Sequence, residues 1–496
     1  MIARDRSRDV RPDILILQAD QLAPHFLPAY GHRVTLTPHL SKLAGSGAVF
    51  DAAYCNSPLC APSRASMLTG RMPSEIGAYD NATPISSALP TFAHYLRAGG
   101  YRTALAGKMH FIGPDQMHGF EERLSTDIYP ADLGWTPDWD DPEGDPMVYY
   151  LRMAVEELAG GGLSPEPTWQ MRYDDEVADR AVRWLRDAGD RDRPILLTVS
   201  FTHPHDPFRI TSEYWNRYRG RPIDDPVAPE PPDPVDDPTR RLREIFGLDR
   251  LALDGSRVRA IRRAYYGEIS YLDDNIGRVL AALRVANRNR PTMIIFVSDH
   301  GEMLGERGLW FKMSFFERSA RVPLIINAPG VPATRVQEPV SLLDLLPTLL
   351  DAAGLDPDLA DTPGQSLLPL AGGAAPCGSR PVYGEFLGEG LTEPMVMIRD
   401  GRFKYISMRG APALLFDVVD DPEERVNLIG TGRAAGVAER LAGLAGSRWD
   451  LAALRERVVV SQRERRLVHR ALTTGTHVPW DYPTTGEPPD SYVRNV

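Results

Sequence analysis

The chain has 496 residues, enough to bury a large core, and its 43% hydrophobic and 25% charged content is that of an ordinary globular protein. A formal net charge of −11 disfavours nucleic acid as a partner. The first residues carry several charges and no apolar run, so we expect neither a signal peptide nor a membrane span, and predict a cytoplasmic protein.

Three short apolar runs are typical of strands buried on both faces, and each ends at residues that carry chemistry. Because sites of open α/β sheets lie at the carboxyl ends of their strands, we expect these residues to meet at one edge. Strand and helix patterns alternate, so the sheet should be mostly parallel. The runs are Asp13 to Ala19, followed by Asp20; Pro194 to Ser200, followed by His203 and His205; and Thr292 to Ser298, followed by Asp299 and His300.

Two further segments are predicted near the first strand. Thr37 is expected to cap a helix with Pro38 at its first position and Gly45 as its end, before a strand from Ala48 to Tyr54. In the segment from Tyr101 to His110, strand alternation would place Lys108 and His110 on one face.

The stretch from Asn56 to Gly70 predicts a turn that delivers Cys60 to a helix start. Pro58 and Pro62 restrict the backbone, and Ser63 can act as a cap, so the thiol would lie near helix N–H groups that suit an anion. Taken alone, Cys60 is more simply a buried small side chain or a disulfide partner of Cys55. With Cys377 the chain has three cysteines, too few for a disulfide framework.

The last third of the chain predicts a smaller unit. Residues 341–355 read as an apolar helix interrupted by Pro347, and residues 361–376, rich in Gly, Pro and Ala, read as a boundary. A hairpin turning at Asp400 and Gly401 and a helical stretch from Ala434 to Gln462 follow. We therefore predict a catalytic domain over 1–370, a subdomain over 371–475 and an irregular tail over 476–496.

Three motifs resemble the sulfatase family of the alkaline phosphatase superfamily. The order Cys60, Ala61, Pro62, Ser63, Arg64, then Leu68 to Arg71, resembles the signature in which the cysteine is oxidised to formylglycine by a formylglycine-generating enzyme. Gly107 to His110 resembles the second signature, and Leu309 to Glu317 resembles the active-site lysine segment that follows Asp-His-Gly. The resemblance implies a large mostly parallel sheet flanked by helices, with a C-terminal antiparallel sheet packed by a helix.

The resemblance also implies a divalent metal ion. Its ligands would be Asp20, Asp299, His300 and the modified residue 60, and Ca²⁺ is our first choice, with Mn²⁺ or Mg²⁺ as alternatives. Sulfatases usually have two adjacent acids where this chain has Asp20 followed by Gln21.

In the mechanism that the resemblance implies, the hydrated aldehyde at position 60 attacks the ester sulfur and later expels sulfate. Arg64 would hold the formylglycine and the metal ligands, and Lys108 and Lys312 would neutralise sulfuryl oxygens. The base for the second step would be His110. The acid that protonates the leaving oxygen would be His205, with His203 as the weaker candidate.

A narrower resemblance, to the choline sulfatases, covers Lys108 to Trp139 and the segments THVPWDY and SYVRN near the end. Choline is a quaternary ammonium ion, so its recognition depends on aromatic faces and carboxylates. Our predicted contacts are Trp135 and Asn81, with Glu389 or Glu385 as the negative charge and His203 as a further substrate contact; Tyr129, Trp139 and Trp310 are weaker candidates. The implied substrate is choline sulfate.

Other functions remain open from the sequence. A phosphonate monoester or phosphodiester hydrolase, or an arylsulfatase, would share the formylglycine and the Asp-His pair. A non-catalytic homologue that only binds a ligand is the third alternative. We expect a homodimer or homotetramer, whose tail could contact a neighbouring subunit.

Overall fold

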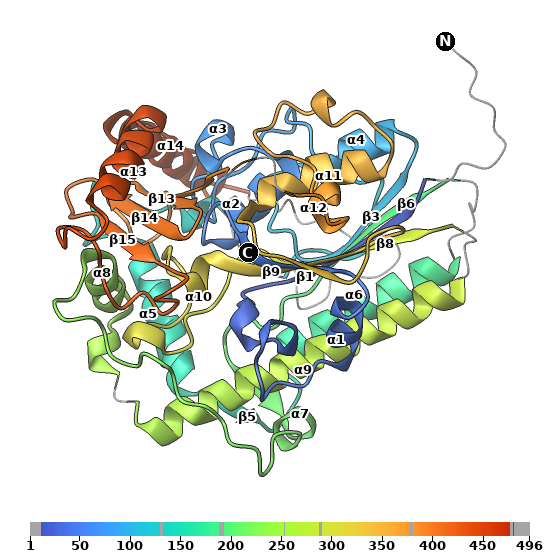
Figure 1. The fold of residues 1–496 in the computed structure, drawn as a ribbon, viewed down its shortest axis with the longest axis horizontal. Coiled ribbons are helices and arrows are strands. Elements are labelled where there is room, and N and C mark those ends of the chain that lie inside the picture. The colour runs from blue at the N-terminus through green and yellow to red at the C-terminus, as the bar shows by residue number, and fades with distance from the viewer. Residues whose placement is uncertain are drawn as a thin grey trace.

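A computed structural model describes residues 11–128, 132–187, 193–251, 253–286, 290–375, 378, 380–476 and 480. Within these ranges, a central sheet lies between two layers of helices, and a smaller sheet with two helices packs at one end (Figure 1). None of the helices in these ranges is long and apolar enough to cross a membrane.

In the described part of the chain, the central sheet has nine strands in the order β10-β2-β9-β8-β1-β6-β3-β4, with β11 also paired to β2. β9 runs antiparallel to β2 and β8, and the other pairs are parallel, which confirms the predicted mostly parallel sheet. The strands are β1 (Asp13–Ala19), β2 (Ala48–Tyr54), β3 (Arg102–Gly107), β4 (Glu122–Arg123), β6 (Ile195–Ser200), β8 (Thr292–Ser298), β9 (Arg321–Asn327), β10 (Thr334–Val336) and β11 (Val340–Ser341).

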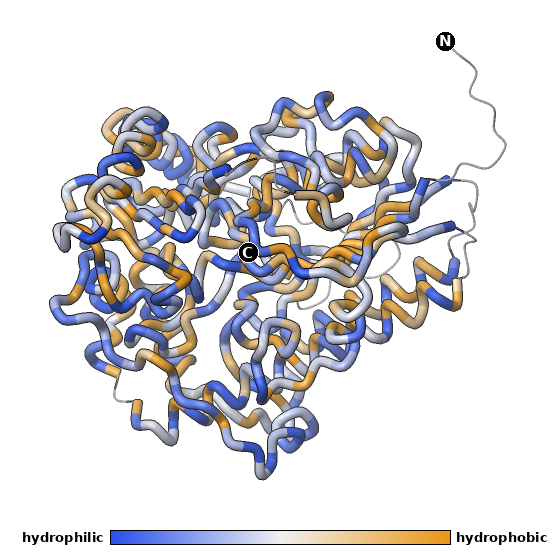
Figure 2. The backbone as a smooth tube through the Cα atoms, in the orientation of Figure 1, coloured by the Kyte–Doolittle hydropathy of each residue, from blue (hydrophilic) through white to orange (hydrophobic). Residues whose placement is uncertain are grey.

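The register of the sheet aligns the ends of its four middle strands. Gln18 of β1 pairs with Ser200 of β6 and with Val297 of β8, and Gly107 of β3 also pairs with Ser200. β1 and β6 are buried along their whole length, and Figure 2 shows their hydrophobic character in the middle of the molecule. Continuous apolar runs are expected for strands covered on both faces.

Helices cover both faces of this sheet (Figure 1). One layer contains α2, α4, α11 and α12, and the other contains α1, α6 and the long α9. The helices before the C-terminal part are α1 (Pro38–Ala44), α2 (Cys60–Thr69), α3 (Pro73–Ile76), α4 (Phe92–Ala98), α5 (Pro146–Ala159), α6 (Trp169–Asp187), α7 (Ser212–Asn216), α8 (Asp237–Phe246), α9 (Gly255–Ala286), α10 (Glu317–Ala320), α11 (Leu345–Ala352) and α12 (Leu368–Ala371).

The C-terminal part has the predicted antiparallel sheet. Its hairpin turns one residue later than predicted, at Gly401 and Arg402, because Asp400 is the last residue of β13 and pairs with Phe403. The predicted helix over 434–462 is instead two helices, because the chain leaves helical geometry at Trp449 and Asp450 starts the next helix by accepting two backbone N–H groups. The elements are β12 (Val382–Phe386), β13 (Met395–Asp400), β14 (Phe403–Met408), β15 (Leu414–Asp417), α13 (Ala435–Arg448) and α14 (Leu451–Leu472). A separate two-stranded sheet pairs β5 (Gly162–Ser164) with β7 (Arg209–Thr211).

Two predicted helix caps differ in the structure. Thr37 makes no capping hydrogen bond to α1; the carboxylate of Asp273 on α9 accepts the N–H groups of His39 and Leu40 instead. α2 begins at Cys60, so Ser63 lies inside it, and its hydroxyl donates to the carbonyl oxygen of Asp299 at 2.5 Å. At α1 a distant carboxylate replaces the local cap, and at α2 the predicted cap residue lies inside the helix and bonds a distant carbonyl oxygen.

The strand predicted over 101–110 ends earlier, at Gly107. A Cβ atom there would lie 1.9 Å from the carbonyl oxygen of Ser200, so only glycine lets β3 approach the end of β6 this closely. Lys108 and His110 therefore lie in the loop after the strand, and His110 has a positive φ of 61°. A strand face does not position them.

Candidate active site

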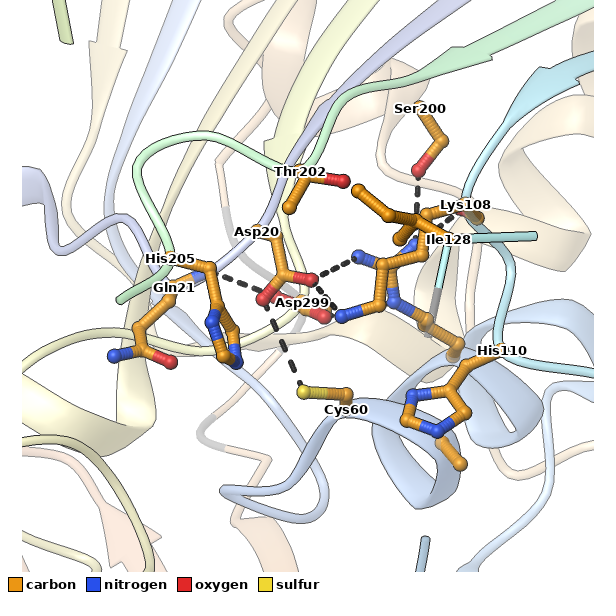
Figure 3. A network of polar contacts seen from close by, with 12 residues as sticks. Asp20, Gln21, Cys60, Lys108, His110, Ile128, Ser200, Thr202, His205 and Asp299 are labelled. Carbon is orange, nitrogen blue, oxygen red and sulfur yellow. Dashed lines mark hydrogen bonds and ion pairs between the residues drawn. The ribbon is translucent and has the colours of Figure 1, made fainter. Parts of the chain in front are cut away.

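The carboxyl ends of β8, β1, β6 and β3 bring together the polar residues that follow them. The first turn of α2 points Cys60 toward the same place from the helical layer, and Figure 3 shows the side chains converging on its sulfur. The residues that follow the strands are Asp299 and His300 after β8, Asp20 after β1, His205 after β6, and Lys108 after β3.

Four of these side chains could hold a metal ion. The ligand atoms of Asp20, Cys60, Asp299 and His300 all lie within 4.8 Å of one another, and all four residues are buried. The Sγ atom of Cys60 is 3.2 Å from Nε2 of His300 and 3.9 Å from Oδ1 of Asp20. Two carboxylates and one imidazole beside Cys60 form a donor set that fits a divalent cation with a preference for oxygen.

Arg64 holds the two carboxylates of this group. Its Nε donates to Oδ2 of Asp299 at 2.8 Å, and its Nη2 donates to Oδ2 of Asp20 at 3.2 Å. Its Nη1 donates to the carbonyl oxygen of Lys108 at 2.6 Å and to Oγ of Ser200 at 2.8 Å. The guanidinium therefore ties the ends of four strands to α2, and leaves Oδ1 of Asp20 3.9 Å from Sγ of Cys60.

Two buried lysines surround Cys60. Lys108 forms an ion pair with Oδ2 of Asp20. The Nζ atom of Lys312 lies 3.4 Å from Sγ of Cys60, 2.5 Å from Oε1 of Gln21 and 2.6 Å from Nε2 of His205. Their ammonium groups give the site the positive charge that binding a sulfuryl group requires.

The same two ammonium groups act on the thiol. Burial and Asp20 raise the pKa of Cys60, but Lys108 and Lys312 outweigh them, so the pKa of this thiol is below its ordinary value.

Cys55 is also buried, and burial raises the pKa of its thiol. Both cysteines are free, so the alternative of a Cys55–Cys60 disulfide is wrong. Cys377 lies outside the described residues.

In the view of Figure 3, Cys60 lies between His205 and His110. Nδ1 of His205 is 2.8 Å from the carbonyl oxygen of Asp206, which makes Nδ1 the donor and turns Nε2 toward Lys312. Burial, Lys108 and Arg64 hold the pKa of His110 well below its ordinary value. His110 is therefore an unprotonated imidazole at neutral pH.

The position of His110 depends on Asp127, which sequence reasoning missed. Oδ2 of Asp127 accepts the backbone N–H groups of Met109 at 3.3 Å, His110 at 2.7 Å and Phe111 at 3.3 Å. One carboxylate thus fixes the turn in which His110 has its positive φ. An Asp seventeen positions away gives no local signal of this role.

Asn81 and Glu389 lie beside the start of α2. Oδ1 of Asn81 accepts the N–H of Ala61 at 3.0 Å, and the backbone N–H of Asn81 donates to Oε1 of Glu389 at 3.1 Å. Glu389 is fully buried, and its Oε2 has no hydrogen-bond partner in the part of the chain that the structure describes. Burial, with the charge of Asp80, raises the pKa of Glu389 to about 8.

The predicted aromatic contact Trp135 ends the short 3-10 helix η3 (Leu133–Trp135). Its half-buried ring packs near Ile112 and Leu133 and stacks on Tyr150 with 5.7 Å between ring centroids. Because Ile112 is two residues after His110, the ring of Trp135 lies near the segment that carries His110. Two of the weaker aromatic candidates, Trp139 and Trp310, are buried in the main core, and Tyr129 lies outside the described residues.

Two other candidates, Glu385 and His203, have side chains that contact other groups of the protein. Oε1 of Glu385 accepts from Oγ of Ser74 and Nε1 of Trp449, and its Oε2 accepts the N–H of Ser74, so both oxygens are used. His203 is buried with Nδ1 2.7 Å from Asp174. Its ring packs edge-on against Tyr271. These contacts hold the side chains of Glu385 and His203 in place within the fold.

A buried ion pair that the sequence did not reveal supports the segment with Asn81. Arg465 of α14 donates to both oxygens of Asp80, at 2.7 and 2.6 Å. The two residues are 385 positions apart, so only the folded chain brings them together. The C-terminal helix therefore stabilises the loop beside the site.

Comparison with known proteins identifies the family. A family model described as Sulfatase matches residues 12–355. The chain belongs to the sulfatase family. A model described as N-sulphoglucosamine sulphohydrolase, C-terminal, matches residues 305–445, and one described as Choline sulfatase enzyme C terminal matches residues 456–496.

Among individual sulfatases, the chain is 42% identical to choline-sulfatase of Rhizobium meliloti (strain 1021), over 98% of this chain and 96% of that protein. It is 29% identical to arylsulfatase K of Danio rerio, over 84% of this chain and 80% of the relative. The family model and the choline-sulfatase relative support a sulfatase, an enzyme that hydrolyses sulfate esters, over the non-catalytic alternative. The family generally carries a metal site and a cysteine-derived formylglycine.

Solved structures agree with the fold. Phosphonate monoester hydrolase of Agrobacterium radiobacter aligns with a TM-score of 0.68 and 27% identity, covering 90% of this chain and 96% of that one. A solved structure of a protein in complex with its substrate D-glucosamine-2-N,6-O-disulfate aligns with a TM-score of 0.69 at 22% identity, over 92% of this chain and 98% of that one. The predicted fold class is confirmed: a central sheet flanked by helices with a smaller C-terminal antiparallel sheet.

Proposed function

We propose that this sulfatase uses formylglycine at position 60 to hydrolyse choline sulfate to choline and sulfate. The observation that carries the proposal is the 42% identity to a choline-sulfatase over 98% of the chain. The match of residues 456–496 to the choline sulfatase C-terminal model supports the same substrate.

We infer that the metal ion is Ca²⁺, held by Asp20, Asp299, His300 and the oxidised side chain at position 60, with Mn²⁺ and Mg²⁺ as the alternatives. When bound, such an ion acts as a Lewis acid that makes the hydrated aldehyde nucleophilic. Arg64 keeps the carboxylates of Asp20 and Asp299 turned toward this position.

The remaining residues bind the sulfuryl group and move protons. Lys108 and Lys312 neutralise the charge that develops on the sulfuryl oxygens. His205 protonates the leaving oxygen as an imidazolium ion, in which Nε2 carries a proton in addition to the one that Nδ1 donates to the carbonyl oxygen of Asp206. His110, whose low pKa keeps it neutral, accepts the proton whose loss from residue 60 expels sulfate.

Recognition of the ammonium group falls to Trp135 and Glu389 in this proposal. A cation over an aromatic face gains about 0.5 to 2 kcal/mol, so one ring is too weak alone and the carboxylate of Glu389 adds the charge. Asn81 joins the first turn of α2 to Glu389, so it holds the ammonium site at a fixed distance from residue 60. We propose Glu389, and not Glu385, because Oε2 of Glu389 is open.

The substrate is tested by comparing kcat/KM for choline sulfate, an aryl sulfate and an aryl phosphonate monoester. The protein is produced together with a formylglycine-generating enzyme. We expect choline sulfate to have the highest kcat/KM. Equal kcat/KM values for choline sulfate and the aryl sulfate would indicate a general arylsulfatase. A higher kcat/KM for the phosphonate would contradict the proposal and indicate a phosphonate monoester hydrolase.

Phosphonate monoester or phosphodiester hydrolysis is the second candidate function. The 27% identical phosphonate monoester hydrolase of Agrobacterium radiobacter has the same fold over 90% of this chain. The same substrate comparison distinguishes the two functions.

We also propose a homodimer or homotetramer in which the tail over 476–496 contacts a neighbouring subunit. Residues 477–479 and 481–496 lie outside the described residues. Light scattering on the full chain and on a chain truncated after residue 476 tests this, because the proposal predicts a smaller assembly for the truncated chain.

A further inference from the structure

We propose that Glu302 is a positioning residue for Lys312, which it aims at position 60 through the side-chain amide of Gln21. The inference rests on the proposed role of Lys312 in hydrolysis. Glu302 and Gln21 are both fully buried and neither belongs to the group of metal ligands.

The amide of Gln21 lies between two carboxylates and an ammonium. Its Nε2 donates to Oε2 of Glu302 at 2.6 Å and to Oδ1 of Asp206 at 3.0 Å, and its Oε1 accepts from Nζ of Lys312 at 2.5 Å. A carboxylate only accepts and an ammonium only donates. If the amide were turned over, its NH₂ group would face the ammonium and its oxygen would face two carboxylates. Glu302 and Asp206 therefore fix the amide orientation that Lys312 needs.

The other oxygen of Glu302 fixes the backbone that carries Lys312. Oε1 accepts the N–H groups of Leu304 at 2.7 Å and Phe311 at 2.8 Å. Phe311 precedes Lys312 and has a φ of 66°, a conformation that a bulky residue adopts only under constraint. On the other side of Lys312, the N–H of Met313 donates to the carbonyl oxygen of Pro58, two residues before Cys60. One carboxylate thus sets both the backbone and the side-chain partner of Lys312.

The backbone of Gln21 is fixed as well. Its N–H donates to Oδ1 of Asp299 at 3.1 Å, its carbonyl oxygen accepts from the hydroxyl of Tyr265 at 2.7 Å, and its φ is 63°. The side-chain amide of Gln21 can therefore rotate by half a turn, but the backbone that carries it is held in place. At the position where sulfatases usually have a second acid, this chain has a residue that orients a lysine.

The variant Glu302→Gln tests the proposal with a change of nearly the same shape. Whichever way the new amide turns, its NH₂ group meets either the NH₂ of Gln21 or the N–H groups of Leu304 and Phe311. We expect kcat for choline sulfate to fall about 10- to 100-fold, as for a catalytic group that is misplaced by a fraction of an ångström to an ångström. KM should change less than threefold.

Glu306→Gln is the matched control. Glu306 is 1% exposed, lies on the same segment and also accepts two backbone N–H groups, those of Val227 and Ala228. We expect Glu306→Gln to lower the melting temperature as much as Glu302→Gln does while leaving kcat within about threefold of the wild type.

A double-mutant cycle with Lys312→Ala separates positioning from general stabilisation. If Glu302 acts through Lys312, Glu302→Gln has less than a threefold effect on kcat once Lys312 is Ala. The same 10- to 100-fold loss in both backgrounds would overturn the inference, as would a wild-type kcat for Glu302→Gln. If Lys312→Ala alone leaves kcat unchanged, the proposed role of Lys312 fails first.

Discussion

The backbone N–H of Asn81 donates to Oε1 of Glu389 at 3.1 Å, and Oε2 of the same carboxyl group has no partner in the part of the chain that the structure describes. A buried carboxyl group with one open oxygen is stabilised when a cation binds beside it. Asn81 also accepts the N–H of Ala61, next to Cys60. Asn81 therefore fixes the position of this open oxygen relative to residue 60, which is proposed to attack the sulfur atom.

Removing the charge of Glu389 should weaken binding of choline sulfate specifically. For Glu389→Gln at pH 9, where the wild-type carboxyl group is ionised, we expect KM for choline sulfate to rise at least about tenfold, since a desolvated charge pair contributes more than a kilocalorie per mole. KM for an uncharged aryl sulfate should change less than threefold. Steady-state kinetics on both substrates checks this, and equal effects would remove Glu389 from ammonium recognition.

The same carboxyl group predicts a pH dependence. Its pKa is raised to about 8, so Glu389 is mostly protonated at pH 7 and ionised at pH 9. Because the ionised form attracts the ammonium group, KM for choline sulfate should fall as the pH rises through 8. The fall should be absent in Glu389→Gln, and for the aryl sulfate in the wild type. A KM for choline sulfate that stays constant from pH 7 to 9 would contradict it.

Trp135→Ala should raise KM for choline sulfate far more than for an aryl sulfate, because the ring is proposed to cover the ammonium group. Trp169→Ala is the control, since Trp169 is 43% exposed on α6 and has no proposed role. Equal losses on the two substrates would assign Trp135 to packing against Tyr150 alone.

The strand ends could be predicted from the sequence, since apolar runs followed by acids or histidines depend on local composition. β1, β2 and β8 have the predicted bounds, and the residues after β1, β3, β6 and β8 meet at one edge. Resemblance to the sulfatases supplied the motifs around Cys60 and Lys312. The apolar runs and the sulfatase motifs are both patterns of residues that are close together in the sequence.

The residues that orient these groups could not be predicted. Asp127 fixes the turn of His110, Glu302 fixes Gln21, and Asp273 replaces Thr37 as the cap of α1. Glu302 and Gln21 are 281 positions apart, and no spacing rule relates them. The choice between Glu389 and Glu385 likewise depended on which carboxylate oxygens already have donors.

The ion pair between Arg465 and Asp80 should be essential for stability. Arg465→Met leaves a buried carboxylate without its cation and should lower the free energy of unfolding by about 3 to 5 kcal/mol. Asp80→Asn combined with Arg465→Met should recover most of that loss, since no charge is then left unpaired. Urea unfolding measures both variants, and a loss below about 1 kcal/mol for Arg465→Met would contradict the expectation.

His118 should make the fold less stable in mild acid. Burial lowers its pKa to about 4 although Asp115 opposes this, so the folded protein keeps His118 neutral where the unfolded chain, with a pKa near 6.5, binds a proton. The free energy of unfolding should therefore fall as the pH drops from 6.5 to 4, by at most about 1.4 kcal/mol per pH unit.

The matched variant is His118→Asn, because asparagine tolerates the positive φ of 37° at this position. Urea midpoints between pH 4.5 and 6.5 should vary less with pH in His118→Asn than in the wild type. An unchanged slope would assign the acid sensitivity to other groups.

The most direct test of the account is the mass of the peptide that contains Cys60, taken from active protein produced with a formylglycine-generating enzyme. We predict the mass of the aldehyde or its hydrate, in proportion to the specific activity of each preparation, and no turnover for Cys60→Ala. Full activity in a preparation whose peptide carries an unmodified thiol would contradict the account.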